Sequence, residues 1–81
     1  MNETMRLISA ALLEGYVAHQ KVCMVTGTAL APSTTVLVRD VNTKFVAVYS
    51  AAQYDAECAE LGGPPPAPDF QVVDGRKVYG E

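Results

Sequence analysis

Residues 34–50, TTVLVRDVNTKFVAVYS, decide the fold that this sequence predicts. The stretch holds two runs of β-branched and aromatic residues, 34–41 and 44–49, which is the composition of β-strands. Only Asn42 and Thr43 separate the runs. Asn tolerates the positive φ of a two-residue hairpin turn and Thr tolerates it poorly, so a longer turn that includes Lys44 is the alternative. A central antiparallel hairpin is expected.

Side-chain alternation along this hairpin predicts two sheet faces that are both apolar near the base and polar near the tip. A two-residue turn pairs Arg39 with Val46 and Leu37 with Val48. One face then carries Leu37, Arg39, Val41, Lys44, Val46 and Val48, and the other carries Val36, Val38, Asp40, Phe45, Ala47 and Tyr49. A solvated face would alternate more cleanly, so each face should be covered by another element or by a partner.

The N-terminal region predicts a first helix over about residues 3–15, with 18 as the alternative end. Asn2 or Thr4 can cap it, and Gly15 is expected to end or bend it. Its apolar residues recur at helical spacing and are expected to contact the sheet. They are Met5, Ile8, Leu12 and Tyr16.

A second helix is predicted over about 51–61. Ser50 and Gln53 form a capping box at its start, and Gly62 with Gly63 stops it. One face should pack on the sheet, and it consists of Ala51, Tyr54, Cys58 and Leu61.

The remaining segments predict further β-structure. Residues 21–25 have the composition of a short buried strand, and the prolines of 64–68 predict a stiff polyproline II strap. Asp74-Gly75 is typical of a type I′ turn, so 70–79 is expected to form a second hairpin in which Phe70 faces Tyr79. The chain of 81 residues is thus expected to form a single α+β domain, 1–81. Two helices would pack on a mainly antiparallel sheet of three to five strands that contains two hairpins.

Composition limits the function. The chain is 49% hydrophobic with a net charge of −3, which excludes a disordered chain. Its six Lys and Arg residues are scattered, which argues against a nucleic-acid-binding stripe. Its longest apolar runs are far too short to cross a membrane. The N-terminal segment lacks the charge pattern of a signal peptide, and the two cysteines form no CxxC pair, so a cytoplasmic setting is expected.

Few residues suggest catalysis. His19, Cys23 and Cys58 are the only His and Cys residues, and they could meet as zinc ligands or as a Cys-His nucleophile pair. Scattered residues of this kind are more often structural. We therefore expect reduced, buried and inert cysteines, no catalytic residues, and no metal or cofactor.

Two groups of residues are candidates for binding a partner. A patch at the hairpin tip would be rimmed by Arg39, Asp40 and Lys44. The solvent face of the second helix would present an acidic ridge, which consists of Gln53, Asp55, Glu57 and Glu60.

In size, acidity and its many Ala and Val residues, the sequence resembles small accessory proteins of bacteria and their phages, including anti-CRISPR and other host-takeover inhibitors. The resemblance implies a non-enzymatic protein-binding module that blocks a larger host protein or complex. The two apolar faces of the central hairpin, with only two short helices to cover them, separately suggest a homodimer through the central sheet as one form of association. Three alternatives stay open. They are a homo-oligomeric structural subunit, a small Cys/His enzyme, and a nucleic-acid accessory protein that uses Arg39, Lys44, Arg76 and Lys77.

Overall fold

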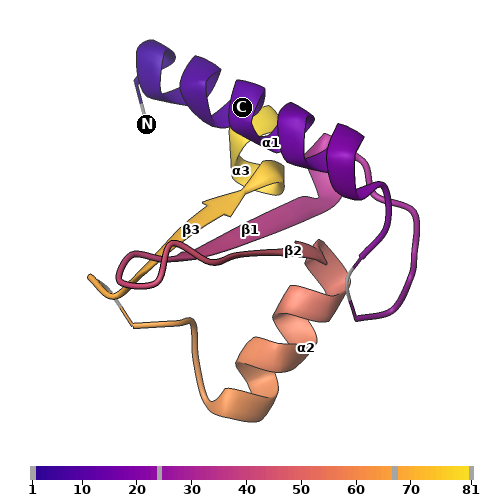
Figure 1. Cartoon of the computed structure of the whole chain (residues 1–81), viewed down its shortest axis with the longest axis vertical. Helices are drawn as coiled ribbons and strands as arrows, with labels where there is room; N and C mark the ends of the chain where they lie inside the picture. The colour runs from indigo at the N-terminus through magenta and orange to yellow at the C-terminus, as the bar shows by residue number, and fades with distance from the viewer. Residues whose placement is uncertain (1, 24, 67, 81) are drawn as a thin grey trace.

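Three strands form one antiparallel sheet in the order β2-β1-β3 (Figure 1). The computed structural model describes residues 2–23, 25–66 and 68–80. Its strands are β1 (Thr35–Asp40), β2 (Val46–Ser50) and β3 (Phe70–Asp74). Its helices are α1 (Glu3–Gln20), the short 3-10 turn η1 (Pro32–Thr34), α2 (Ala51–Leu61) and α3 (Gly75–Tyr79). The α+β class is confirmed, with three strands in the sheet.

The central hairpin has the predicted register. Leu37 pairs with Val48, and Arg39 pairs with Val46. Its turn is the longer alternative, because Lys44 adopts a positive φ of 67° and donates its N–H to the Asp40 carbonyl at 2.8 Å. The Asp40 carboxylate also accepts the N–H groups of Asn42 and Thr43, which closes an Asx turn. These two bonds hold the pKa of Asp40 below its ordinary value.

The predicted second hairpin is wrong, because the chain changes from strand to helix at Asp74-Gly75. The Asp74 carboxylate caps α3 by accepting the N–H of Arg76 at 3.0 Å. Strand β3 instead pairs with the free edge of β1, with Val73 opposite Leu37. Asp is a helix cap as readily as a turn former, and α3 brings Val78 into the core.

The segment after α1 is also not the strand predicted for 21–25. Its described residues contribute an isolated bridge, between Val22 and Ala29, and Met24 lies outside the described residues. Helix α1 runs past Gly15 to Gln20 and ends where Lys21 takes a positive φ. Gly15 is therefore an interior helical residue and not the end of the helix.

Helix α2 has the predicted bounds and the predicted ends. The Ser50 hydroxyl accepts the N–H of Gln53 at 3.3 Å, and Gly62 ends the helix in the left-handed conformation. Ala51 is buried, and Tyr54 and Cys58 are half-buried, as expected for the packing face. The prediction is wrong for Leu61, which is 81% exposed at the last turn of α2.

The two sheet faces are covered by different helices, with α1 and α3 on one side and α2 on the other (Figure 1). The core on the α1 side is formed by Leu13, Leu37, Val48 and Val78. The residues of α1 that are buried are Ser9 and Leu13. The predicted contact stripe of Met5, Ile8, Leu12 and Tyr16 is wrong, because Tyr16 is half-buried and the other three are exposed. Helix α1 packs on Val78 of α3 as well as on the sheet, and the side of α1 that carries Leu13 therefore faces the core.

Tyr79 and the proline strap connect the end of the chain to the rest of the fold. Tyr79 does not face Phe70 as predicted; its hydroxyl donates to the Glu14 carboxylate at 2.6 Å and ties α3 to α1. This bond raises the pKa of Tyr79 to about 12. Within the strap, Pro65 lies against the α2 side of the sheet, and Ala67 lies outside the described residues.

Arg76 connects α3 to α2 through two carboxylates. Its guanidinium donates two bonds to Asp55, at 2.7 and 3.1 Å. It donates two more to Asp74, at 3.1 and 2.9 Å. These bonds lower the pKa values of Asp55 and Asp74 and raise that of Arg76.

Gly75 is predicted to be essential for packing. A Cβ at this position would overlap the Pro32 carbonyl oxygen and lie 2.8 Å from that of Thr35. Gly75→Ala should lower the free energy of unfolding by about 1–3 kcal/mol, because the backbone must move apart. Gly15→Ala is the matched control, since a Cβ there meets nothing within 4 Å and should stabilise the helix by up to about 1 kcal/mol. Denaturant titration measures both, and equal stability of the two variants would contradict the close approach.

Arg76→Gln is predicted to destabilise the protein in a pH-dependent way. Arg76 keeps the pKa of Asp74 below its unfolded value, so this stabilisation is present above about pH 4 and is lost as pH falls through the folded pKa. The stability difference between wild type and Arg76→Gln should therefore be largest near neutral pH and shrink in acid. Lys21→Gln is the control, because no ion pair of Lys21 occurs among the described residues and Lys21 does not contribute to the lowered pKa of Asp74. A difference that does not vary with pH would contradict this role of Arg76.

Candidate functional site

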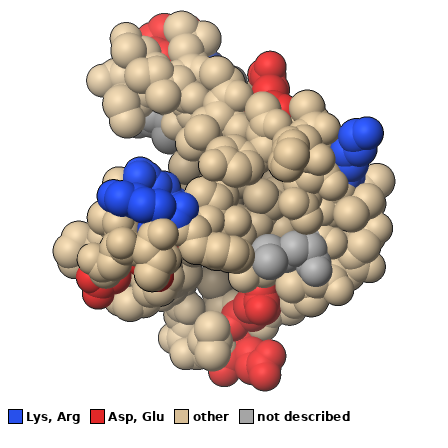
Figure 2. All heavy atoms as spheres, in the orientation of Figure 1, with Lys and Arg blue, Asp and Glu red and all other residues tan. Residues whose placement is uncertain are grey.

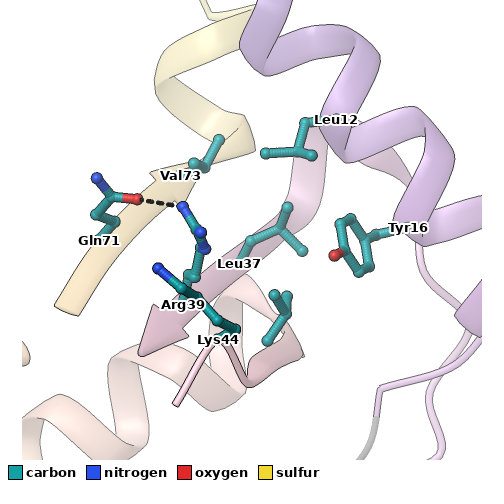
Figure 3. Close-up of a pocket in the computed structure, with 8 residues that line it drawn as sticks. Leu12, Tyr16, Leu37, Arg39, Lys44, Gln71 and Val73 are labelled. Carbon is teal, nitrogen blue, oxygen red and sulfur yellow. Dashed lines mark hydrogen bonds between the residues drawn. The ribbon is translucent and has the colours of Figure 1, made fainter. Parts of the chain in front are cut away.

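A hollow of about 380 Å³ lies between α1 and the tip end of the sheet (Figure 3). Helix α1 covers the base of this sheet face and leaves the part near the hairpin turn open. The lining residues are Leu12, Tyr16, Leu37, Arg39, Lys44, Val46, Gln71 and Val73. The volume is within the range of sites that bind small molecules or protein side chains.

The floor of the hollow consists of side chains that lie opposite one another on the three neighbouring strands. One row is Val46, Arg39 and Gln71, and the next contains Leu37 beside Val73. Leu12 and Tyr16, one helical turn apart on α1, form the wall above this floor. The interior is therefore mainly aliphatic and aromatic, and its polar groups come from Arg39, Lys44 and Gln71.

Arg39 and Lys44 give the hollow a positive rim. The guanidinium of Arg39 donates to the neutral Gln71 side chain at 3.2 Å (Figure 3). Among the residues that the structure describes, the ion pairs involve Arg6 and Arg76, and neither Arg39 nor Lys44 pairs with a carboxylate. A compact basic cluster beside a hollow is visible in Figure 2. Both charges are thus available to an incoming anion.

An apolar stripe on α1 continues from the hollow into solvent. Met5, Ile8 and Leu12 are 51%, 58% and 43% exposed. By helical geometry they lie roughly a quarter turn from the buried Ser9–Leu13 line. Leu12 belongs both to this stripe and to the wall of the hollow. A second, shallower hollow of about 240 Å³ lies on the other side of Leu12 and Tyr16, lined also by Ala11, Gly15 and His19.

The structure brings together two of the three residues predicted for the tip patch. Arg39 and Lys44 line one hollow, as their shared face implies. Asp40 does not line this hollow; its carboxylate is engaged by the turn amides. Asp40 is therefore a turn-forming residue in this structure.

The predicted acidic ridge of α2 is not a uniform solvent face. Asp55 is engaged by Arg76, and Glu57 lines a small hollow with Tyr49 and Tyr54 on the α2 side of the sheet. Gln53 and Glu57 are half-buried, whereas Asp55 and Glu60 are exposed. The sequence predicts a solvated ridge because it places Arg76 in a hairpin; in the structure Arg76 lies on α3 and pairs with Asp55.

The His and Cys residues lie in separate surroundings. His19 is exposed beside the shallow hollow on α1, and Cys58 lies with Tyr54 on the opposite side of the sheet. Cys23 is buried in the loop after α1. In 2–23, 25–66 and 68–80, no group of three or more His, Cys, Asp or Glu side chains is arranged to hold a metal ion.

Both cysteines are free thiols, as predicted, but only Cys23 is buried, since Cys58 is half-buried. Burial by itself would raise the pKa of the Cys23 thiol. Hydrogen bonds from the Thr26 hydroxyl and from the amides of Thr26, Ser50 and Val25 outweigh this effect and lower the pKa to about 6.

The sequence alone did not identify Leu12, Tyr16, Gln71 and Val73 as parts of one site. The central register placed Arg39, Lys44 and Val46 on one face, and helical spacing grouped Leu12 with Tyr16. Gln71 and Val73 join them only because β3 pairs with β1. The alternation of β3 could have shown that these two residues share a face, but not which strand would be their neighbour.

No protein-family model, no curated protein and no solved structure matches the chain. Within the described part of the chain, no helix has the length and apolar character needed to cross a membrane. The functional argument therefore depends on the geometry of the hollow, its two cations and the adjoining stripe.

Cys23 is predicted to titrate near pH 6 in the native protein. In a Cys58→Ser background, thiolate absorbance should report this pKa, and the unfolded protein should titrate near 8.5. Because the folded pKa is the lower one, stability should rise from about pH 6 to about 8.5 and be lost as pH falls through 6. Replacing Cys23 by Ser as well should flatten this slope. A native thiol that titrates near 8.5 would contradict the hydrogen bonding described above.

Proposed function

We propose that this protein is a non-enzymatic protein-binding module, which acts by occupying a surface of a larger partner and blocking it. The proposed contact surface combines the hollow lined by Arg39 and Lys44 with the α1 stripe of Met5, Ile8 and Leu12. We call this combined area the α1–tip surface. Action as an inhibitor of a host protein, of the anti-CRISPR kind, is part of this proposal and is supported by composition alone.

One observation carries the proposal, which is the continuity of exposed apolar side chains from the stripe into the hollow. Leu12 belongs to both, so the stripe and the hollow form one surface and not two isolated patches. Single exposed apolar residues are ordinary, but a contiguous apolar patch with a polar rim is typical of an interaction site. Covering this patch with a partner would remove its apolar area from water and stabilise the complex.

The α1–tip surface differs from the interface expected from the sequence. The central sheet was expected to bind through a bare face, but Leu37 and Val48 are buried by the protein's own elements. What stays open is the tip end of that face together with the flank of α1. Glu60, exposed on α2, is on the part of the predicted acidic ridge that stays free for a secondary contact.

A homo-oligomeric subunit is the second candidate, and the strand order favours it. In the described chain, β2 and β3 are the outer strands and each pairs on one side only, with β1. Such edges can pair with a second copy. Sedimentation at high concentration separates this candidate from a hetero-complex, because edge pairing gives a dimer without any added partner.

Leu12→Glu is predicted to weaken partner binding strongly and to leave the fold intact. The substitution places a charge on the α1–tip surface at a side chain that is already 43% exposed. The partner recovered on the tagged wild-type protein would be purified and its affinity measured directly. Loss of at least tenfold in affinity is expected, as for a residue near the centre of an interface.

Leu7→Glu is the matched control, because Leu7 is on the same helix, is 60% exposed and does not line the hollow. Circular dichroism and thermal unfolding check that both variants fold. If Leu12→Glu binds the purified partner as tightly as Leu7→Glu does, the α1–tip surface is not the interface. If the purified partner does not bind the wild-type protein directly, the binding-module proposal fails.

A further inference from the structure

We infer that the α1–tip surface accepts an acidic amphipathic helix of the partner protein. The inference rests on the proposed function and adds the chemistry of the occupant. Its apolar side chains would enter the hollows beside Leu12 and Tyr16, and its carboxylates would lie against Arg39 and Lys44.

Charge is the first argument. The chain is acidic overall, with a net charge of −3, but the rim of the main hollow presents two cations. Arg39 is held by a neutral amide, and in the described chain neither cation is neutralised by a carboxylate. Arg76, by contrast, is paired with two carboxylates. An acidic partner would complement the rim, and a basic one would be repelled.

The shape of the surface is the second argument. Leu12 and Tyr16 form a ridge between the hollows of about 380 and 240 Å³. A helix that crosses or follows this ridge can place bulky side chains three or four positions apart on its two sides. From Met5 to Tyr16 the surface extends about 16 Å along α1, which is the length of roughly three helical turns.

Backbone hydrogen bonding favours a helix over a strand at this place. The floor of the hollow is a sheet face, which offers side chains and no free backbone groups. An incoming strand would leave its own N–H and C=O groups without partners there, whereas a helix satisfies them internally. A strand would instead bind at the outer edges of β2 or β3, which are not part of the α1–tip surface.

A second copy of this chain does not offer the required helix. Its most acidic helix is α2, but the apolar side of α2 is occupied by its own sheet, with Ala51 buried and Tyr54 half-buried. Asp55 of that helix is paired with Arg76. The occupant is therefore assigned to a different protein.

The experiment selects peptides from a displayed library of amphipathic helices. The library keeps an apolar face of Leu and Phe at varied registers and encodes Glu and Lys with equal frequency at the flanking positions. Selection is run on the full-length wild-type protein, and enriched peptides are synthesised. Binding is followed by chemical-shift changes at the amides of Leu12, Tyr16 and Gln71.

The expected result is enrichment of Glu over Lys, with roughly tenfold tighter binding of Glu peptides than of their Lys counterparts. The double variant Arg39→Glu/Lys44→Glu should reverse this preference. Lys21→Glu/Lys77→Glu is the charge-matched control and should keep it, because neither residue lines the two hollows. If the reversed variant fails to fold, Arg39→Gln/Lys44→Gln should bind Glu and Lys peptides equally.

The other outcomes each overturn a stated part of the inference. Enrichment of Lys peptides, or equal binding of both kinds at the mapped surface, overturns the acidic partner but leaves a docking surface. Absence of any enriched helix overturns the inference that a helix binds here. The proposed function itself fails only if Leu12→Glu leaves direct binding of the purified partner unchanged or if no such binding exists.

Discussion

The close approach of Gly75 to the carbonyl oxygens of Pro32 and Thr35 is the constraint on which the arrangement of the other elements depends. At this point the chain leaves β3 and begins α3 under the Asp74 cap, packed against the start of β1. Because no Cβ is present, the two backbones meet, and Val78 reaches the core beside Leu37. A larger residue would hold α3 away from the sheet and leave this core incomplete.

The position of α3 determines which side of α1 is buried. Ser9 and Leu13 of α1 are buried against the core. The hydroxyl of Tyr79 on α3 donates a hydrogen bond to the Glu14 carboxylate and fixes α1 in this orientation. The larger apolar residues Met5, Ile8 and Leu12 are consequently turned onto the flank. The stability of the fold and the exposure of the α1–tip surface thus have the same physical origin, which is the packing of α1 on a short terminal helix.

The cations have two different uses. Arg76 is bonded to Asp55 and Asp74 and connects α3 with α2, so its positive charge is neutralised within the molecule. Arg39 and Lys44 lie at the other end of the sheet beside an apolar hollow. A cation that is paired with carboxylates stabilises the structure. A cation without such a pair, beside an apolar surface, favours a partner of opposite charge. This separation is the main reason to propose recognition at the hairpin tip and not at the acidic side of α2.

Local chemistry in the sequence was sufficient for the central hairpin and for α2. Alternating β-branched residues around Asn42 determine the register, and Ser50, Gln53 and Gly62 determine the two ends of the helix, because caps and turns involve residues close in the chain. Asp74-Gly75 was ambiguous, since the pair suits a tight turn and a helix start equally well. Only the tertiary structure decided between them, through a backbone contact with Pro32 that is distant in sequence. The same long-range decision placed Gln71 beside Arg39 and turned Leu12 outward, so the candidate site could not be read from spacing alone.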